Sequence, residues 1–194
     1  MSEAAPIGLR ETARLSRAPI HTGMVLFLIS EAFLFGSLFW TYFYLRAESP
    51  VWPPAGVELD SLLASVNTVV LLSSSVSVWW AARRIRKGSE RGLAAGLAIT
   101  VFLGVGFLGV TLFEWTHETF RPWTSAYGSI FYTLTGFHAL HVLGGVLLML
   151  TLLARTLRHR FSPGSFLAVE IGSLYWHFVD LIWIVVFTTL FILR

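Results

Sequence analysis

The sequence contains no cysteine among its 194 residues. A chain without cysteine forms no disulfide, and it has no thiolate for a zinc finger, an iron–sulfur cluster, a c-type haem or a thiolate-bound copper. Charged residues are also scarce, at 13%, which is about half of the roughly 25% of an average soluble domain. These shortages exclude several classes of metalloprotein and argue against a soluble protein.

Apolar residues are correspondingly abundant. They make up 55% of the chain, and the mean hydropathy of +0.70 is typical of a membrane protein. The pI is basic, but the positive residues lie beside apolar runs, so they indicate membrane topology and not nucleic-acid binding. Residues 1–20 are too polar for a secretory signal peptide, and we expect the first apolar run to act as its own insertion signal.

Five apolar runs are each long enough to cross a bilayer as a helix, which takes about 20 residues. They cover residues 22–45, 62–82, 92–115, 127–154 and 166–193. The runs are continuous and do not alternate, so the strands of a membrane barrel are not expected. The sequence therefore predicts an all-α membrane protein, a bundle of five transmembrane helices spanning 22–194 behind an N-terminal tail of 1–21.

Positive charges gather on alternate connections of this bundle. Eleven of the 14 Lys and Arg residues lie in the N-terminal tail, after the second run or after the fourth. The positive-inside rule therefore predicts that the N-terminus is cytoplasmic and the C-terminus outside. An odd number of spans agrees with ends on opposite sides.

Glycines recur inside the runs. Gly88, Gly92 and Gly96 are four residues apart, and the third and fourth runs carry further glycines at 104, 106, 109, 136, 144 and 145. Small residues at such spacings let helices approach closely, so we expect them to serve packing. There is no convincing internal repeat, and the inverted-repeat architecture of many transporters is not visible.

Ionisable residues inside a span are costly, and they persist where they face other helices, water or a partner. We expect an intramembrane polar cluster, structural or proton-linked, formed by Glu31, His138, His141, Glu170, His177 and Asp180. A rise of about 1.5 Å per residue places two further residues, Glu114 and His117, at the outer edge of the third span.

Glu31 has no opposite charge at its helical neighbour positions. It therefore needs a proton, or a partner from another helix. A contact with a histidine of the fourth span, His138 or His141, is the simplest solution. The contact is either a structural lock between helices or part of a proton-linked or ligand-binding site.

A metal site is the competing interpretation. His-x-x-His at 138–141, His-x-x-Asp at 177–180 and Glu-x-x-His at 114–117 could supply ligands, the last resembling half of a di-iron motif. The spacing does not exclude haem ligation by His138 or His141, but no specific feature of the sequence indicates it. However, Glu114 and His117 lie about half a membrane away from Glu31 at helical rise. We predict no catalytic residue, no cofactor-binding residue and no metal ligand in this chain.

Several strings of residues occur in order along the chain. They are Ser30-Glu31, Trp52-Pro53-Pro54, Asn67-Thr68, Glu114-Trp115, Tyr127-Gly128-Ser129, Gly136-Phe137-His138-Ala139-Leu140-His141-Val142, Glu170 and Tyr175-Trp176-His177-Phe178-Val179-Asp180. Through these strings the chain resembles subunit III of haem–copper terminal oxidases, the cytochrome c oxidase type. The resemblance covers residues 22–193.

The resemblance implies an accessory subunit of an aerobic respiratory complex, with haem and copper in partner subunits and none in this chain. It implies contact with subunit I, which carries the proton pathways, and with subunit II. Stabilisation of subunit I, support of proton uptake and bound phospholipid are further implications. The five-span form implies the bacterial cytoplasmic membrane, and no nucleic acid is expected as a partner.

Two departures from the family pattern matter. Larger members have two additional N-terminal helices beside a lipid-holding cleft, and Thr111 stands where many members have glutamine. The string at residues 175–180 is most similar to the cytochrome c oxidase branch, so the resemblance implies a proton-pumping cytochrome c oxidase. A quinol oxidase of the same superfamily, which also has a five-helix subunit III, stays the alternative. Two different functions stay open as well: a stand-alone accessory factor of another respiratory complex, such as nitric oxide reductase, and an independent proton or metal transporter.

Overall fold

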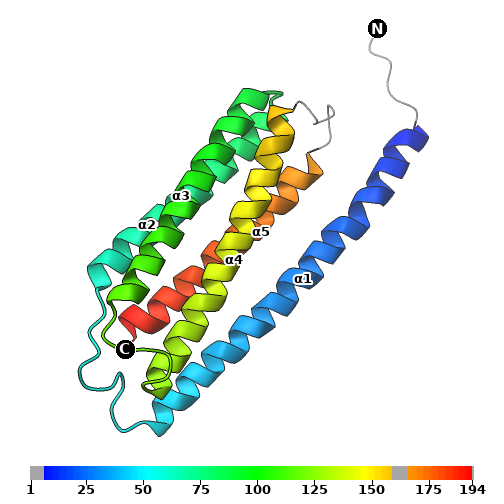
Figure 1. Ribbon diagram of the computed structural model, residues 1–194. Helices are drawn as coiled ribbons and strands as arrows, with labels where there is room; N and C mark the ends of the chain where they lie inside the picture. Colours follow the sequence, from blue (N-terminus) through cyan, green and yellow to red (C-terminus); the bar gives the residue numbers. More distant parts are fainter. Residues whose placement is uncertain (1–6, 159–165, 194) are drawn as a thin grey trace.

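The computed structural model describes residues 7–158 and 166–193, with side chains from residue 19 onwards. The described elements are α1 (Ile7–Glu48), α2 (Ser61–Arg86), α3 (Glu90–His117), α4 (Ala126–Leu157), α5 (Leu167–Phe187) and a final π-helical turn, η1 (Thr188–Ile192) (Figure 1). Five helices are long and apolar enough to cross a membrane, and the described ranges contain no strand. The predicted all-α class and the five spans are confirmed.

Polar side chains begin three of the helices. The Asp60 carboxylate accepts from the backbone amides of Leu62 and Leu63 at 3.1 and 3.0 Å. Ser89 and Ser125 cap α3 and α4 in the same way. Each cap satisfies amides that the first helical turn leaves without a partner. Between α2 and α3 the chain turns through Gly88, whose φ of 78° is unfavourable for a residue with a side chain.

The helices extend beyond the apolar runs that predict them. α1 begins at Ile7 and includes Pro19, so the described part of the expected tail is also helical. Hydropathy detects only the apolar part of a segment. The helix itself continues into the neighbouring polar residues, which can also adopt helical backbone conformation. The helical conformation of residues 7–21 therefore had no signal in the apolar pattern.

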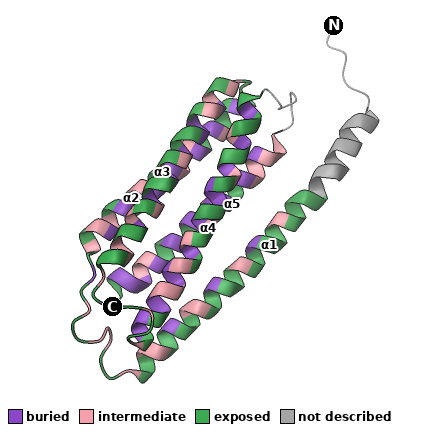
Figure 2. Ribbon diagram, in the orientation of Figure 1, coloured by how far each residue is buried: buried purple, intermediate pink, exposed green. Residues whose placement is uncertain are grey.

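Four helices form a compact group, and α1 stands partly apart from it. α2 packs on α3, α3 on α4, and α5 on α2 and α4, whereas α1 packs on α4 and α5 (Figure 1). Only 11% of the residues in the apolar window of α1 are buried, against 50% in α5, and Figure 2 shows α1 largely exposed. The Tyr42 hydroxyl donates to the Thr189 carbonyl at 3.1 Å, and Arg46 donates to the Leu193 carbonyl, so α1 is held firmly at one end.

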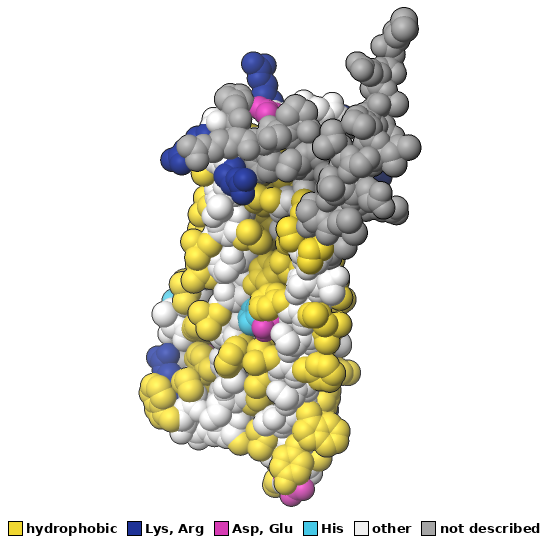
Figure 3. Space-filling view, turned by 90° about the vertical axis from the view of Figure 1, so that its right-hand side faces the viewer, with side chains coloured by type: hydrophobic (Ala, Val, Ile, Leu, Met, Phe, Trp, Pro, Cys, Tyr) yellow, Lys and Arg dark blue, Asp and Glu magenta, His cyan; other side chains and the backbone are white. Residues whose placement is uncertain are grey.

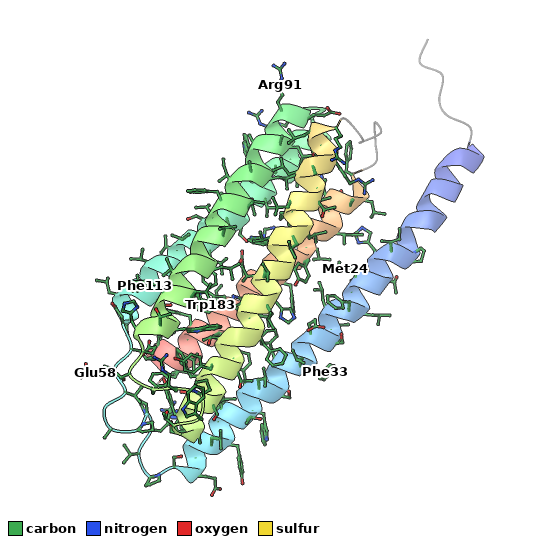
Figure 4. All side chains as sticks on the ribbon, viewed as in Figure 1. Met24, Phe33, Glu58, Arg91, Phe113 and Trp183 are labelled. Carbon is green, nitrogen blue, oxygen red and sulfur yellow. The ribbon has the colours of Figure 1, made fainter. Side chains whose placement is uncertain are left out.

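The two ends of the bundle differ in charge. We call the end where α2 turns into α3 the basic end; it carries Arg83, Arg86 and Arg91. Basic side chains gather mainly at this upper end in Figure 3. We call the opposite end, formed by the connections 49–60 and 118–125, the loop end. Arg91 and Glu58 mark these two ends in Figure 4.

The Trp176 side chain fills the centre of the bundle and is fully buried. Its indole N–H donates to the Ser74 hydroxyl on α2 at 2.8 Å. A Cβ atom added at Gly104 on α3 or at Gly145 on α4 would lie 2.8 or 2.7 Å from the indole ring. The ring fits between α3 and α4 because both positions are glycine. The Trp176 side chain thus joins α5 to α2, α3 and α4.

The glycine spacing in the third run has the expected effect on one side of α3. A Cβ atom at Gly92 or Gly96 would lie 2.8 or 2.6 Å from side-chain carbons of α2, so the two helices approach closely there. By contrast, Gly106 and Gly109 have no atom within 4 Å of a built Cβ, and they face outward. The packing expected of these two is not found among the described residues.

Replacing Gly145 with alanine tests the role of the Trp176 contact. We expect Gly145→Ala to destabilise the protein by about 1–3 kcal/mol, because the added methyl group overpacks the indole ring. Thermal unfolding in detergent measures the loss. Gly109→Ala is the matched control; it adds the same methyl group to a membrane helix, in open space, and should cost little. Equal effects of the two substitutions would contradict the tight packing at Trp176.

Candidate functional sites between the helices

The six ionisable residues expected in one intramembrane cluster lie at separate places in the structure. Glu31 and His141 meet between α1 and α4, and His177 and Asp180 share a serine of α2. His138 lies in the core beside Trp183, and Glu170 lies towards the basic end. The sites are therefore best described one at a time.

Glu31 and His141 form a direct contact across the gap between α1 and α4. The Glu31 Oε2 atom lies 2.9 Å from His141 Nε2, and the two side chains keep exposed fractions of 19% and 15%. Figure 3 shows an acidic side chain touching a histidine in the middle of an otherwise apolar face. The contact expected between the first and fourth spans is present, and it uses His141.

The hydrogen bonds of His141 define how many protons this contact holds. His141 Nδ1 lies 2.7 Å from the Phe137 carbonyl oxygen, which can only accept, so Nδ1 carries a hydrogen. The Glu31–His141 bond then needs one more proton, on Nε2 or on the carboxyl group. In either case the pair has no net charge, which suits its position in the membrane.

A second site joins α2 and α5. The Ser75 hydroxyl donates to Asp180 Oδ2, and the Ser75 Oγ atom lies 2.9 Å from His177 Nδ1. Since that hydroxyl proton is engaged, Nδ1–H donates to Ser75, and Nε2 accepts from the Ser173 hydroxyl at 3.2 Å. Serine stands between histidine and aspartate here, which is not the order of a hydrolytic triad.

Ser75 was not among the predicted site residues. Span two contains several serines, and serines in membrane helices commonly bond back to their own backbone. Ser73 does so, donating to the Val69 carbonyl at 2.7 Å. The i, i+3 spacing of His177 and Asp180 marked one side of the site, but no sequence signal separated Ser75 from its neighbours.

His138 is fully buried and lies away from the Glu31 contact. Its ring centroid is 4.7 Å from that of Trp183 and 5.7 Å from that of Phe107. Neither ring nitrogen has a hydrogen-bond partner among the described residues. Its contacts are therefore those of an aromatic core residue.

Glu170 forms a partly exposed ion pair with α2. Its carboxylate lies 3.1 Å from the Arg86 guanidinium, and the exposed fractions are 32% for Glu170 and 60% for Arg86. Water and salt screen such a pair, so it adds at most about 1 kcal/mol of stability.

Glu114 and His117 lie in the last turns of α3 at the loop end, away from the other six residues. His117 Nδ1 is 2.9 Å from the Phe113 carbonyl oxygen, and the imidazole packs on the Phe113 ring. Just beyond the helix, partial burial, with a smaller contribution from the negative charge of Asp60, raises the pKa of Glu118 to about 7. The loop end therefore carries a carboxyl group that titrates near neutral pH.

Metal coordination needs several ligands around one point. Among residues 7–158 and 166–193, no group of three or more His, Asp or Glu side chains is placed to hold a metal ion. The sequence motifs at 114–117, 138–141 and 177–180 are thus not assembled into one site in the described part of the chain.

These features define a multi-pass membrane protein whose helices meet through buried polar contacts. The family model described as cytochrome c oxidase subunit III matches residues 2–193. The chain is 39% identical over 172 residues to cytochrome c oxidase subunit 3 of Thermostichus vulcanus, covering 88% of this chain and 86% of the relative.

Two further relatives agree with this assignment. Cytochrome c oxidase subunit 3 of Synechocystis sp. is 41% identical over 173 residues, covering 88% of this chain and 74% of the relative. A probable cytochrome c oxidase subunit 3 of Nocardia farcinica is 38% identical over 179 residues, covering 90% and 88%. The chain belongs to the cytochrome c oxidase subunit III family.

A double-mutant cycle tests the energetic link between Glu31 and His141. We expect Glu31→Leu and His141→Leu each to destabilise the protein, because each leaves one polar group unpaired in an apolar setting. The double variant should lose less stability than the sum of the two single variants, by a coupling energy of about 1–2 kcal/mol. Thermal unfolding of the purified protein in lipid nanodiscs measures the four stabilities.

The exposed pair offers the control for this cycle. The same cycle on Arg86 and Glu170 should give a coupling of about 0–1 kcal/mol, because water screens that pair. A coupling at Glu31 and His141 no larger than the one at Arg86 and Glu170 would contradict the interhelical lock.

The raised pKa of Glu118 predicts a pH dependence of stability. The folded state keeps the Glu118 proton up to a pKa of about 7, whereas the unfolded chain loses it near the ordinary glutamate pKa of 4.5. The folded state therefore binds more protons between these values, and stability falls as pH rises through this window. We expect Glu118→Gln to flatten the unfolding profile between pH 4.5 and 7.

Glu58→Gln is the control for this prediction, because Glu58 is an exposed glutamate at the same end. Thermal unfolding recorded across the pH range supplies the comparison. A profile for Glu118→Gln that superimposes on the wild-type profile would show that Glu118 does not titrate as described.

Proposed function

We propose that this protein is the accessory, non-redox subunit III of a proton-pumping cytochrome c oxidase in a bacterial cytoplasmic membrane. The observation that carries the proposal is the match of the family model to residues 2–193. The relatives are subunits of cytochrome c oxidases, which favours cytochrome c over quinol as the electron donor of the complex. Haem and copper belong to the partner subunits in this proposal, and this chain stabilises subunit I and supports its proton uptake.

The exposure of α1 supports a partner on that side. Leu26, Phe33 and Trp40 are seven residues apart and have exposed fractions of 62%, 76% and 76%. Phe33 points away from the other helices in Figure 4. Because the described part of α1 packs mainly on α4 and α5, we assign its outer face to contact with subunit I.

The charge difference between the ends supports an orientation. Arginine-rich connections favour the cytoplasmic side. In the proposal the basic end therefore faces the cytoplasm, and the loop end, with Glu58 and Glu118, faces outward. Proton uptake by an oxidase takes place from the inner side, so the basic end is where this chain would assist it.

Purification from native membranes in mild detergent tests the proposal. We expect larger subunits to accompany the 21.7 kDa chain, with haem and copper detected by optical spectroscopy and metal analysis only when these subunits are present. Oxidation assays with cytochrome c and with quinol then identify the donor. Purification of the chain alone, or haem, iron or copper bound to the isolated chain, would contradict the proposal.

Substitutions on α1 make the same experiment more specific. We expect Phe33→Ala combined with Trp40→Ala to reduce recovery of the larger subunits, because both side chains lie on the assigned contact face. Phe102→Ala is the control, since Phe102 is 77% exposed but belongs to α3. Unchanged recovery with the α1 substitutions would place subunit I on another face.

A further inference from the structure

One face of α5 carries polar residues in a row from the basic end to the middle of the helix. Glu170, Ser173, His177 and Asp180 follow one another at spacings of three, four and three residues, so they lie on one side of the helix. α2 supplies partners for this side, since Arg86 pairs with Glu170 and Ser75 with Asp180.

Hydrogen bonds connect the inner part of this row in one direction. The Ser173 hydroxyl donates to His177 Nε2 at 3.2 Å, and His177 Nδ1–H donates to Ser75 Oγ at 2.9 Å. The Ser75 hydroxyl then donates to Asp180 Oδ2. Each donor carries a hydrogen that can move to the next acceptor, so these four side chains form a continuous proton relay.

The relay starts at a cavity at the basic end. This cavity has a volume of about 510 Å³ and lies between α1, α2 and α5. Its polar lining residues are His21, Arg83, Arg86, Glu170, Ser173 and His177. A water molecule takes up about 30 Å³ in the liquid, so the cavity has room and polar partners for several. Water can therefore reach the first two members of the relay.

The relay ends at a carboxyl group with unusual surroundings. Asp180 has an exposed fraction of 3%, and its Oδ1 atom has no hydrogen-bond partner among the described residues. Beyond it on α5, Trp183 packs against His138 and Phe107 and donates to Thr68 at 2.9 Å. A buried carboxylate with only one partner is costly, whereas a protonated carboxyl group is much less so.

We infer that Asp180 is a proton-binding site that exchanges its proton with cavity water through Ser173, His177 and Ser75. A proton carried by cavity water forms a new O–H bond on Ser173 as the Ser173 hydroxyl proton forms the Nε2–H bond of His177. The Nδ1–H bond of His177 then breaks, and its proton passes to Ser75. The Ser75 hydroxyl proton in turn forms the O–H bond on Asp180 Oδ2. One proton enters and one carboxylate is neutralised, and release reverses the same steps.

The charged and titratable groups around the relay are few. His21 of α1 and Arg83 and Arg86 of α2 line the cavity, together with Glu170 of α5 itself. α4 brings His138, which stacks on Trp183 one turn beyond Asp180. The positive groups stand at the cavity, and the aromatic rings of Trp183, His138 and Phe107 close the far side. The site therefore stores a proton and does not conduct one across the bundle.

This inference deepens the proposed role in proton uptake and rests on it for its physiological use. Proton binding at Asp180 can nevertheless be measured independently of the subunit assignment. The absence of haem-containing partners would refute the proposed function. Infrared spectroscopy of the carboxyl group tests only whether Asp180 binds and exchanges a proton.

Infrared spectroscopy of the full chain, with its co-purifying subunits in lipid nanodiscs, tests the site. We expect a carboxylic acid C=O band that gains intensity as pH falls and shifts when H₂O is replaced by D₂O. Asp180→Asn should remove one component of this band, whereas Glu31→Gln and Glu118→Gln, at the separate sites on α1 and at the loop end, should leave that component in place. A band in Asp180→Asn that is unchanged from the wild type, or the absence of a C=O band from the wild type across the pH range, would overturn the inference.

A second variant tests the route by which the proton exchanges. Ser75→Ala keeps the carboxyl group but removes the hydroxyl that links it to His177, so the band should remain while its shift in D₂O becomes slower. Val76→Ala, a neighbouring substitution on an exposed position of α2, is the control and should exchange at the wild-type rate. If the band of Ser75→Ala shifts in D₂O at the wild-type rate, the relay is overturned. This test does not depend on the Asp180→Asn variant, so it holds even if that variant does not assemble.

Discussion

The placement of the Trp176 indole between two glycines fixes the rotation of α5 about its axis, and the polar contacts of α5 with α2 and α4 depend on that rotation. Successive residues of an α-helix point about 100° apart, so the neighbours of Trp176 are directed to its two sides. The Tyr175 hydroxyl reaches the His141 carbonyl on α4 at 3.0 Å, and His177 reaches Ser75 on α2. A different rotation would direct both side chains away from these partners.

The membrane explains why these contacts take the form they do. Polar groups in a hydrocarbon environment are stabilised by partners within the protein, because no bulk water is available to replace them. Glu31 is neutralised by sharing a proton with one histidine, whereas Asp180 is connected to a polar cavity through a serine and another histidine. The need for polar partners within the protein thus gives an interhelical contact at Glu31 and a proton-accessible site at Asp180. Both are compatible with an accessory subunit that serves a neighbouring catalytic subunit.

The fold could be predicted from sequence because length and continuous apolar character define membrane helices. The contact of Glu31 with the fourth span could also be predicted, since helical rise alone gives the depth of each residue. The separation of the polar residues into distinct sites could not, because it depends on the direction in which each side chain points. For His177 and Asp180 that direction is set by the contact of Trp176 with Gly104 and Gly145, which connects helices far apart in sequence.

A density map of the protein in its native complex, at a resolution that separates side chains, tests the central role of Trp176 most directly. The account predicts the indole between Gly104 and Gly145, with Tyr175 directed to α4 and His177 to Ser75. An indole that faces lipid or a partner subunit, or a rotated α5 that directs His177 away from α2, would contradict it.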